Sequence, residues 1–564
     1  MLVVIAWSVW AGLSLYGGFV LARSGQRQLA AAHLGALGQG SVGQGDVSGA
    51  SATLRRASAT FGSADRRLHS PSLLPVSLLP VAGRQLASAR ALTGSASDVA
   101  SAAVTAASSA RAALALPKGT PADRLSILKR LGSSARQLDA ALARIRLGPS
   151  HALLGPLAKA RNTMASDLSR LRVDVGRASG ALDGAVALLS GNHHLLLVGA
   201  NNSEMRNGSG SFLAAGPAVT GSGTVHFGSF VPAYLLKVPA PGVAVPATVA
   251  ARWSWMEPGR YFDALGGSPD FALNAPVAAS IWQSVTGQRI GTVAVVDPVA
   301  LQDLLSVTGP VAFGGQSVSS STVVPLLLSQ QYQNGTAGSP AVSEGRLGGL
   351  ASAVLSKAYS APVDPFRLVA ALASAAAGRH LMLWSSSPSL EADWTRAGAS
   401  GTLSRSDAMV SVVNLAANKI DPLTRVQVNV TRTVAGPDTL LRFTVRVHDT
   451  APAVASLIDG PAPGLGTAPG EYLGMLAVNL PRGLVRASSS GRDQVAASGR
   501  DGGSYVIAPL VRIAAGGTGV YTVSCVLAGH HGELTVMPSA RVPPETWTYA
   551  GGKFSDVRPH TIRW

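Results

Sequence analysis

The spacing of apolar residues changes near residue 194, and this change constrains the fold more than any other feature of the sequence. Before it, over residues 24–190, apolar residues recur every three or four positions in segments rich in Ala, Ser and Arg, which is the pattern of amphipathic helices. After it, the apolar run Leu195 to Val198 is bounded by polar residues and predicts a buried strand. The chain therefore has a helical half followed by a half that contains strands.

The second half divides again by its pattern. Over residues 191–422, short apolar runs such as GTVAVVDP (291–298) alternate with helix-like segments such as PVALQDLLSVTG (298–309), which is typical of an α/β (α+β) domain. Over residues 423–545, strand-like runs such as RVQVNVTRTV and TLLRFTVRVHD are separated by Gly, Pro and Asp turns. Strands repeated at this spacing predict a β-sandwich, followed by a C-terminal tail at 546–564.

The amino terminus predicts a membrane anchor. Residues 2–22, LVVIAWSVWAGLSLYGGFVLA, carry no charge over roughly 20 positions, which is enough to span a bilayer. We favour a retained transmembrane helix at 1–23, because the run is long and lacks the basic leader of a signal peptide; a signal peptide cleaved after Ala22 stays the alternative. The predicted fold class is thus multidomain: a transmembrane helix, an all-α helical stalk or bundle at 24–190, an α/β domain and a C-terminal β-sandwich.

The composition restricts the class of function. Hydrophobic residues make up 47% and charged residues 13%, so the chain can fill large cores and is not a disordered one. The formal net charge of +17 suits an anionic partner such as lipid or wall polymer. No Lys/Arg run is interleaved with aromatic residues, which argues against nucleic acid. Cys525 is the one cysteine, which excludes an internal disulfide and a CxxC metal site.

Three residues stand where a catalytic group would be expected. Glu204 and Arg206 follow the predicted strand in a polar turn and lie two positions apart, which would place them on one face of an extended segment. As a functional pair they would bind a metal ion or a phosphate; as a structural pair they would bridge to other loop residues. Asp297 ends a second predicted strand, where a catalytic carboxylate and a helix cap both fit, and we favour the cap.

Further residues are candidates for ligand binding together with Arg206, and the arginines among them would suit a phosphate. They are charged residues in loops or turns: Arg260, Lys419, Asp421 and Arg425. Lys419, Asp421 and Arg425 gather opposite charges in one turn. No His, Cys or carboxylate pattern with metal-ligand spacing is present, so we predict no metal site from the residues alone.

Several segments, in this order, resemble one bacterial family, the membrane-anchored proteins called domain of unknown function 4012, which is common in actinobacteria and other Gram-positive bacteria. The best matching segments are LLLVGANNSEMRNGSGSF (195–212), SPDF (268–271), TGQRIGTVAVVDPVALQDLLSVTGPV (286–311), GRHLMLWSSSP (378–388) and VVNLAANKIDPLTR (412–425). The chain departs from the family pattern at Asn207-Gly208-Ser209-Gly210, where a Gly-Gly pair usually follows the Arg, and lacks the Asn-Trp usually found before SPDF. The resemblance implies a cell-envelope protein whose bulk lies outside the cytoplasm and whose activity is unknown.

A weaker resemblance covers residues 297–311, where a strand ends in Asp and a Leu-rich helix leads to Gly-Pro-Val. This segment looks like part of the LytR-CpsA-Psr family, which transfers wall glycopolymers from a polyprenyl-pyrophosphate carrier and uses Mg²⁺. Two functions follow as hypotheses. The favoured one is a non-catalytic, single-pass membrane protein that binds or organises envelope material such as an anionic wall polymer, with no cofactor and with membrane lipid bound through the N-terminal helix. The alternative is a transferase acting on polyprenyl-linked glycans with Mg²⁺.

Overall fold

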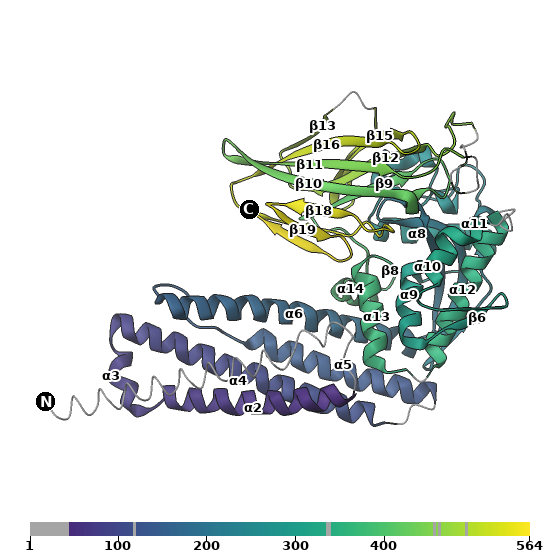
Figure 1. Cartoon of the computed structure of the whole chain (residues 1–564). Coiled ribbons are helices and arrows are strands. Elements are labelled where there is room, and N and C mark those ends of the chain that lie inside the picture. Colours follow the sequence, from purple (N-terminus) through teal and green to yellow (C-terminus); the bar gives the residue numbers. More distant parts are fainter. Residues whose placement is uncertain are drawn as a thin grey trace. The chain divides into compact units, whose positions relative to one another are not determined.

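The computed structural model divides into two compact units, residues 1–190 and 191–564 (Figure 1). The structure describes residues 44–116, 120–333, 340–361, 363–454, 458, 460, 464–490 and 494–564. Over its described residues, the first unit is entirely helical. Its elements are α2 (Gln44–Leu68), η2 (Pro71–Leu73), α3 (Leu74–Ser77), α4 (Pro80–Leu114), α5 (Pro121–Arg144) and α6 (Gly155–Ser190).

Helix α5 shows why this half of the sequence forms helices. Its first turn is closed by a capping box: Thr120 Oγ1 accepts the Asp123 N–H at 3.1 Å, and Asp123 Oδ2 accepts the Thr120 N–H at 3.0 Å. Pro121 occupies the first helical position, where its missing N–H costs nothing. The helices pack through small residues, as at Ala57 and Ala96, which are buried beside Phe61. The periodic apolar pattern therefore produces a helical bundle.

The transmembrane part of the predicted fold class is corrected. The segment 2–22 lies outside the described residues, and no helix among the described residues is both long and apolar enough to cross a bilayer. The predicted anchor thus has no support. The fold class that the structure supports is a multidomain arrangement of helices and sheets.

The second unit begins with a mixed sheet of order β3-β2-β1-β5-β8, to which β4 adds by pairing with β2. Strands β1 and β5 are parallel, whereas β1–β2 and β5–β8 are antiparallel. The strands are β1 (His193–Arg206), β2 (Ser209–Gly221), β3 (Thr224–Phe227), β4 (Val231–Pro232), β5 (Thr292–Val296) and β8 (Leu381–Ser385); a separate hairpin is formed by β6 (Val311–Phe313) and β7 (Gln316–Val318).

Helices cover both faces of this sheet, because the central strands are apolar on both sides. One core joins Leu196 and Val198 of β1 to Phe271 and Ile281 of α8. The opposite core joins Val296 of β5 to residues of α9 and α12. The helices and short turns are α7 (Ala247–Trp253), α8 (Phe271–Thr286), α9 (Pro298–Thr308), α10 (Val323–Pro325), α11 (Gln331–Gln333), α12 (Pro340–Ser360), α13 (Pro365–Ala377), α14 (Pro388–Ala397), η3 (Ala233–Leu235), η4 (Ser254–Met256), η5 (Phe262–Ala264), η6 (Leu326–Gln330) and η7 (Asp421–Leu423).

The rest of the second unit is a β-sandwich of two six-stranded sheets, ordered β13-β16-β11-β10-β18-β19 and β14-β15-β12-β9-β17-β20 (Figure 1). Its strands are β9 (Asp407–Asn414), β10 (Thr424–Ala435), β11 (Asp438–Asp449), β12 (Tyr472–Pro481), β13 (Arg486–Ser490), β14 (Val495–Asp501), β15 (Ser504–Ile513), β16 (Thr518–Ala528), β17 (Glu533–Val536), β18 (Thr546–Tyr549), β19 (Gly552–Ser555) and β20 (His560–Arg563). The alternating residues of β10 and β11 fill one shared core with Trp547 and Cys525. Strands from both sides of the range 423–545 thus complete the sandwich.

Candidate functional site

Strand β1 contains an insertion just before its end. Asn201 pairs with Ser211 and Met205 pairs with Gly210, so residues 202–204 have no partner on β2. A bulge of this kind bends the strand and redirects its side chains. The sequence predicted a turn at Glu204 and Arg206, but both lie on the strand. The turn follows at Asn207–Gly208, where Gly208 adopts a φ of +75° that favours glycine.

Glu204 is the centre of a buried group of three charges. Arg206 Nη2 donates to Glu204 Oε1 at 2.7 Å, and Lys419 Nζ donates to Glu204 Oε2. Burial alone would raise the pKa of Glu204, but the charges of Lys419 and Arg206 outweigh it and lower that pKa to about 2. Burial would lower the pKa of Lys419, and Glu204 reverses this and raises it. Glu204 and Lys419 therefore hold each other in their charged forms.

The remaining donors of Arg206 are also occupied. Its Nη1 donates to the carbonyl oxygen of Asn414 at 3.1 Å. Its Nη2 and Nε donate to the carbonyl oxygen of Asp263 at 3.3 and 3.4 Å. Every nitrogen of the guanidinium group therefore has an acceptor within the protein, so Arg206 has no nitrogen left over for a phosphate ligand.

Asp421 is the centre of a second buried group. Its Oδ1 accepts from Arg541 Nη1 at 2.9 Å and from the Tyr472 hydroxyl at 3.0 Å. Its Oδ2 accepts from the Met205 N–H at 3.0 Å and from Asn414 Nδ2 at 2.9 Å. Tyr472 and Arg541 belong to the sandwich half, as does Asp421 itself, whereas Met205 belongs to β1. The Asp421 carboxylate therefore connects the end of β1 to the sandwich.

Asp297 is both a helix cap and a member of a third group. Its Oδ1 accepts the N–H groups of Val299 and Ala300 at 2.9 and 3.1 Å at the start of α9. Its Oδ2 accepts from Asn202 Nδ2 at 2.8 Å and from His380 Nδ1 at 2.7 Å. Burial lowers the pKa of His380, but the neighbouring Asp297 outweighs it, so the net effect is a raised pKa. The helix cap that we favoured for Asp297 is present, with an ion pair added to it.

Sequence reasoning missed three acidic residues whose pKa is raised by burial. Burial raises the pKa of Glu344 to about 7, and its Oε2 accepts the Ala233 N–H at 2.9 Å. Burial raises the pKa of Asp501 to about 6, although Trp253 Nε1 donates to its Oδ2 at 3.2 Å. Burial also raises the pKa of Asp270, the acid of the SPDF segment. His380 was missed as well. Only Asp270 and His380 lie in segments that carried the family resemblance, and spacing alone gave no signal for any of the four.

Arg260 and Arg425 lie apart from these groups. Arg260 pairs with Glu257 and lies 5.1 Å from the ring centroid of Tyr261. Arg425 is exposed and donates to the carbonyl oxygen of Pro422 at 2.7 Å. The charged residues predicted from the sequence therefore divide: Glu204, Arg206 and Lys419 meet in one group, Asp421 and Asp297 enter two others, and Arg260 and Arg425 join none of them.

Two further features bear on ligand binding. Among the described residues, no three His, Cys, Asp or Glu side chains are grouped so that they could hold a metal ion.

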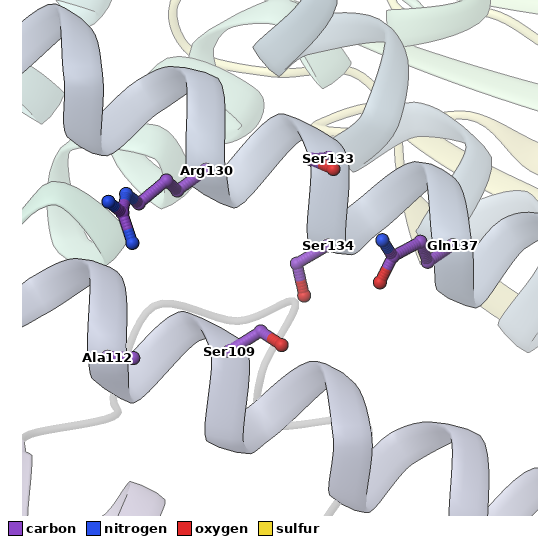
Figure 2. Close-up of a pocket in the computed structure, with 6 residues that line it drawn as sticks. All are labelled: Ser109, Ala112, Arg130, Ser133, Ser134 and Gln137. Atoms are coloured by element: carbon purple, nitrogen blue, oxygen red, sulfur yellow. The ribbon is translucent and has the colours of Figure 1, made fainter.

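A shallow depression of about 240 Å³ lies between α4 and α5 (Figure 2). It is lined by Ser109 and Ala112 of α4 and by Arg130, Ser133, Ser134 and Gln137 of α5. The surface of its lining is more apolar than polar, although it includes serine hydroxyl groups, the amide of Gln137 and one cation, Arg130.

The three buried groups connect separate elements of the second unit through paired charges. Each carboxylate of Glu204, Asp297 and Asp421 is satisfied by cations or donors of the same unit. Buried charges are tolerated only when they are paired in this way. The groups together tie the end of β1 to α9 and to the sandwich.

Comparison with known proteins gives one match. Residues 190–332 match a family model described as a protein of unknown function (DUF4012). No curated protein and no solved structure matches the chain. The resemblance to the LytR-CpsA-Psr family receives no support from these comparisons. The match covers β1, its bulge, Asp297 and α9, so residues 190–332 are similar to the DUF4012 family, as the resemblance of residues 195–212 and 286–311 predicted.

Proposed function

We propose that this protein is a non-catalytic binding protein of the bacterial cell envelope and that its helical unit holds an anionic envelope polymer. One observation carries the proposal: residues 44–190 contain 19 Lys and Arg residues against 8 Asp and no Glu. A surface with such an excess of one sign attracts polyanions over long distances and retains them by many weak contacts. The charge is therefore concentrated in one unit rather than spread over the chain.

Helix α5 offers the most suitable binding surface within this unit. Four exposed cations project from it, namely Lys129, Arg130, Arg136 and Arg144. Arg136 is held by an ion pair with Asp183 of α6, while Arg130 lines the depression of Figure 2 together with serine hydroxyls and Gln137. Cations beside hydroxyl and amide groups suit a polymer that carries both phosphate and sugar hydroxyl groups.

The buried groups of the second unit support a non-catalytic role. A general acid or base must reach the proton that it transfers, and a phosphate ligand needs donors that are not already paired. Glu204 is 4% exposed and is neutralised by Arg206 and Lys419, and Asp421 is fully buried against Arg541. These buried charges stabilise the fold. The exposed charges of the helical unit are the ones that bind the anionic polymer.

The binding test uses the full chain and a poly(glycerol phosphate) of defined length. We expect Lys129→Gln/Arg130→Gln to weaken binding about tenfold or more at low salt and to reduce its salt dependence, because phosphate contacts are lost. The matched control is Arg442→Gln/Arg446→Gln, which removes two exposed arginines from β11 of the sandwich. Equal losses in both double variants, or no binding by the unaltered chain, would refute the proposal.

The location outside the cytoplasm is the second part of the proposal. It rests on the family resemblance and on the cationic unit, which suits the anionic polymers of a cell wall. Protease treatment of intact spheroplasts should cleave the protein, whereas a cytoplasmic marker protein stays intact. Cleavage of both, or of neither, would place the chain elsewhere.

A further inference from the structure

One end of the helical unit exposes a cluster of apolar side chains. The connection between α2 and α4 leaves Leu74, Leu78, Leu79 and Val81 exposed by 61%, 83%, 55% and 67%. Soluble domains expose scattered apolar residues, but four large ones within eight positions of the chain are a grouping of the kind that marks an interaction site. We name this segment, residues 74–81, the apolar tip.

A second connection adds to the same end of the bundle. Gln85, in the second turn of α4, donates from Nε2 to the carbonyl oxygen of Ala152 at 2.8 Å and accepts the Leu154 N–H at 3.0 Å. Leu154, in the connection between α5 and α6, is 63% exposed. The two connections thus lie side by side, and Leu154 extends the apolar surface next to the start of α4.

The local backbone and packing keep the side chains of the apolar tip exposed. Leu73, fully buried, packs with Leu68 and Leu86 and anchors the connection to the bundle. Gly83 allows the chain to turn tightly, because a Cβ at this position would lie 2.4 Å from the carbonyl oxygen of Ser77. Leu73 therefore fills the core position that this connection offers, and the side chains of Leu74, Leu78 and Leu79 stay on the surface.

The charges around the tip are cationic. Arg66 and Arg67 are exposed in the last turn of α2, and Arg84 is exposed in the first turns of α4. Asp65 is the one acidic residue of the sequence between positions 61 and 90, and it pairs with His69 at 3.3 Å. An apolar segment flanked along the chain by exposed arginines suits the boundary of an anionic bilayer, where acyl chains lie beneath phosphate groups.

We propose that the apolar tip inserts into the interface of an anionic membrane, with its leucines and Val81 among the acyl chains and Arg66, Arg67 and Arg84 at the phosphates. This is a peripheral contact of one end of the bundle. It does not depend on polymer binding by α5, because neither Lys129 nor Arg130 belongs to the tip.

The test places a fluorescent reporter on the tip of the full chain. Cys525 is fully buried, so a new Leu78→Cys thiol can be labelled selectively with an environment-sensitive fluorophore. We expect its emission to rise and shift to the blue with vesicles containing anionic phosphatidylglycerol, and lipids with a quencher in the acyl chain should then quench it. Val173→Cys on α6, whose parent residue is 49% exposed, is the matched position and should not respond.

Two sets of variants separate the apolar and the cationic contributions. In the labelled chain, Leu79→Ser/Val81→Ser should raise the vesicle concentration needed for half of the response at least tenfold, because apolar burial is lost. Arg66→Gln/Arg84→Gln should raise it about fivefold for each charge removed. Leu235→Ser/Leu465→Ser, two leucines that are 54% and 48% exposed in the second unit, should leave it unchanged.

Five outcomes would overturn the proposal. The probe at position 78 gives no response, or uncharged phosphatidylcholine vesicles give the same response. A soluble polyanion reproduces the signal, which would assign the tip to polymer. The probe is already shielded in buffer at low protein concentration, which would show that another part of the chain covers the tip. The signal rises with protein concentration without vesicles, which would show contact between copies.

Discussion

Arg541 binds the same residue twice: its Nη1 donates to the carboxylate of Asp421 at 2.9 Å and its Nη2 to the Asp421 carbonyl oxygen at 2.8 Å. The side chains are 1% and 0% exposed. Burial alone would lower the pKa of Arg541, but the charge of Asp421 reverses the shift and raises that pKa, so Arg541 stays charged. This contact joins residues that are 120 positions apart in the sequence. It also positions Asp421, whose carboxylate accepts the Met205 N–H and so connects β1 to the sandwich.

Removing one member of this pair should destabilise the second unit strongly. Arg541→Met leaves the Asp421 carboxylate buried without its cation, for which we expect a loss of about 3–5 kcal/mol in unfolding free energy. Urea unfolding followed by tryptophan fluorescence measures it, because seven of the nine tryptophans of the sequence lie within residues 191–564. The exposed Arg425→Met should change the value by less than about 0.5 kcal/mol. Similar small values for both variants would contradict the structural role of the pair.

Glu204 should stabilise the fold most at neutral pH and lose this contribution in acid. Its pKa is about 2 in the folded chain against 4.5 ordinarily, so its stabilisation is present above 4.5 and is lost as the pH falls toward 2. A shift of this size corresponds to about 3 kcal/mol. Subtracting the Glu204→Gln unfolding curve from that of the unaltered chain should reveal this slope. A difference that stays constant between pH 5 and pH 2.5 would show that Glu204 is not charge-paired.

Asp501 should show the opposite dependence on pH. Its folded pKa of about 6 lies above the ordinary 3.8, so its unfavourable contribution is absent below 3.8 and grows until the pH passes 6. Asp501→Asn should therefore raise the unfolding free energy at pH 8 by about 1–3 kcal/mol and leave it nearly unchanged at pH 3.5. The same fluorescence assay applies. Destabilisation at pH 8 would mean that the charged carboxylate is required.

Gly210 should tolerate no side chain. A Cβ there would lie 2.4 Å from the carbonyl carbon and 2.5 Å from the carbonyl oxygen of Asn201, and the backbone cannot yield cheaply. Gly210→Ala should cost about 3 kcal/mol. Gly345 lies inside α12 with nothing within 4 Å of its Cβ position, so Gly345→Ala should gain about 0.5–1 kcal/mol. Equal effects of the two changes would contradict the close approach of β1 and β2.

Local patterns in the sequence determined much of the secondary structure. The run Leu195 to Val198 predicted a buried strand, and β1 buries all four residues. The capping residues at Thr120–Asp123 start α5, and the run GTVAVVDP forms β5 followed by α9, capped by Asp297. These elements follow from periodicity and from side-chain-to-backbone hydrogen bonds, which act within a few residues.

The ends of the sandwich and the partners of the buried charges were decided by the tertiary structure. The sequences of β9 and of β18–β20 do not by themselves mark these segments as parts of the sandwich. They are stabilised by pairing with distant strands, β9 with β12, β18 with β10 and β20 with β17. Lys419 reaches Glu204 across 215 positions, and His380 reaches Asp297 across 83. A charged residue carries no mark of its distant partner, because ion pairing depends on where burial brings two chain segments together. The sequence alone therefore named Glu204, Arg206 and Asp297, and only the folded chain decided which partners these buried charges have: Glu204 pairs with Arg206 and Lys419, and Asp297 with His380.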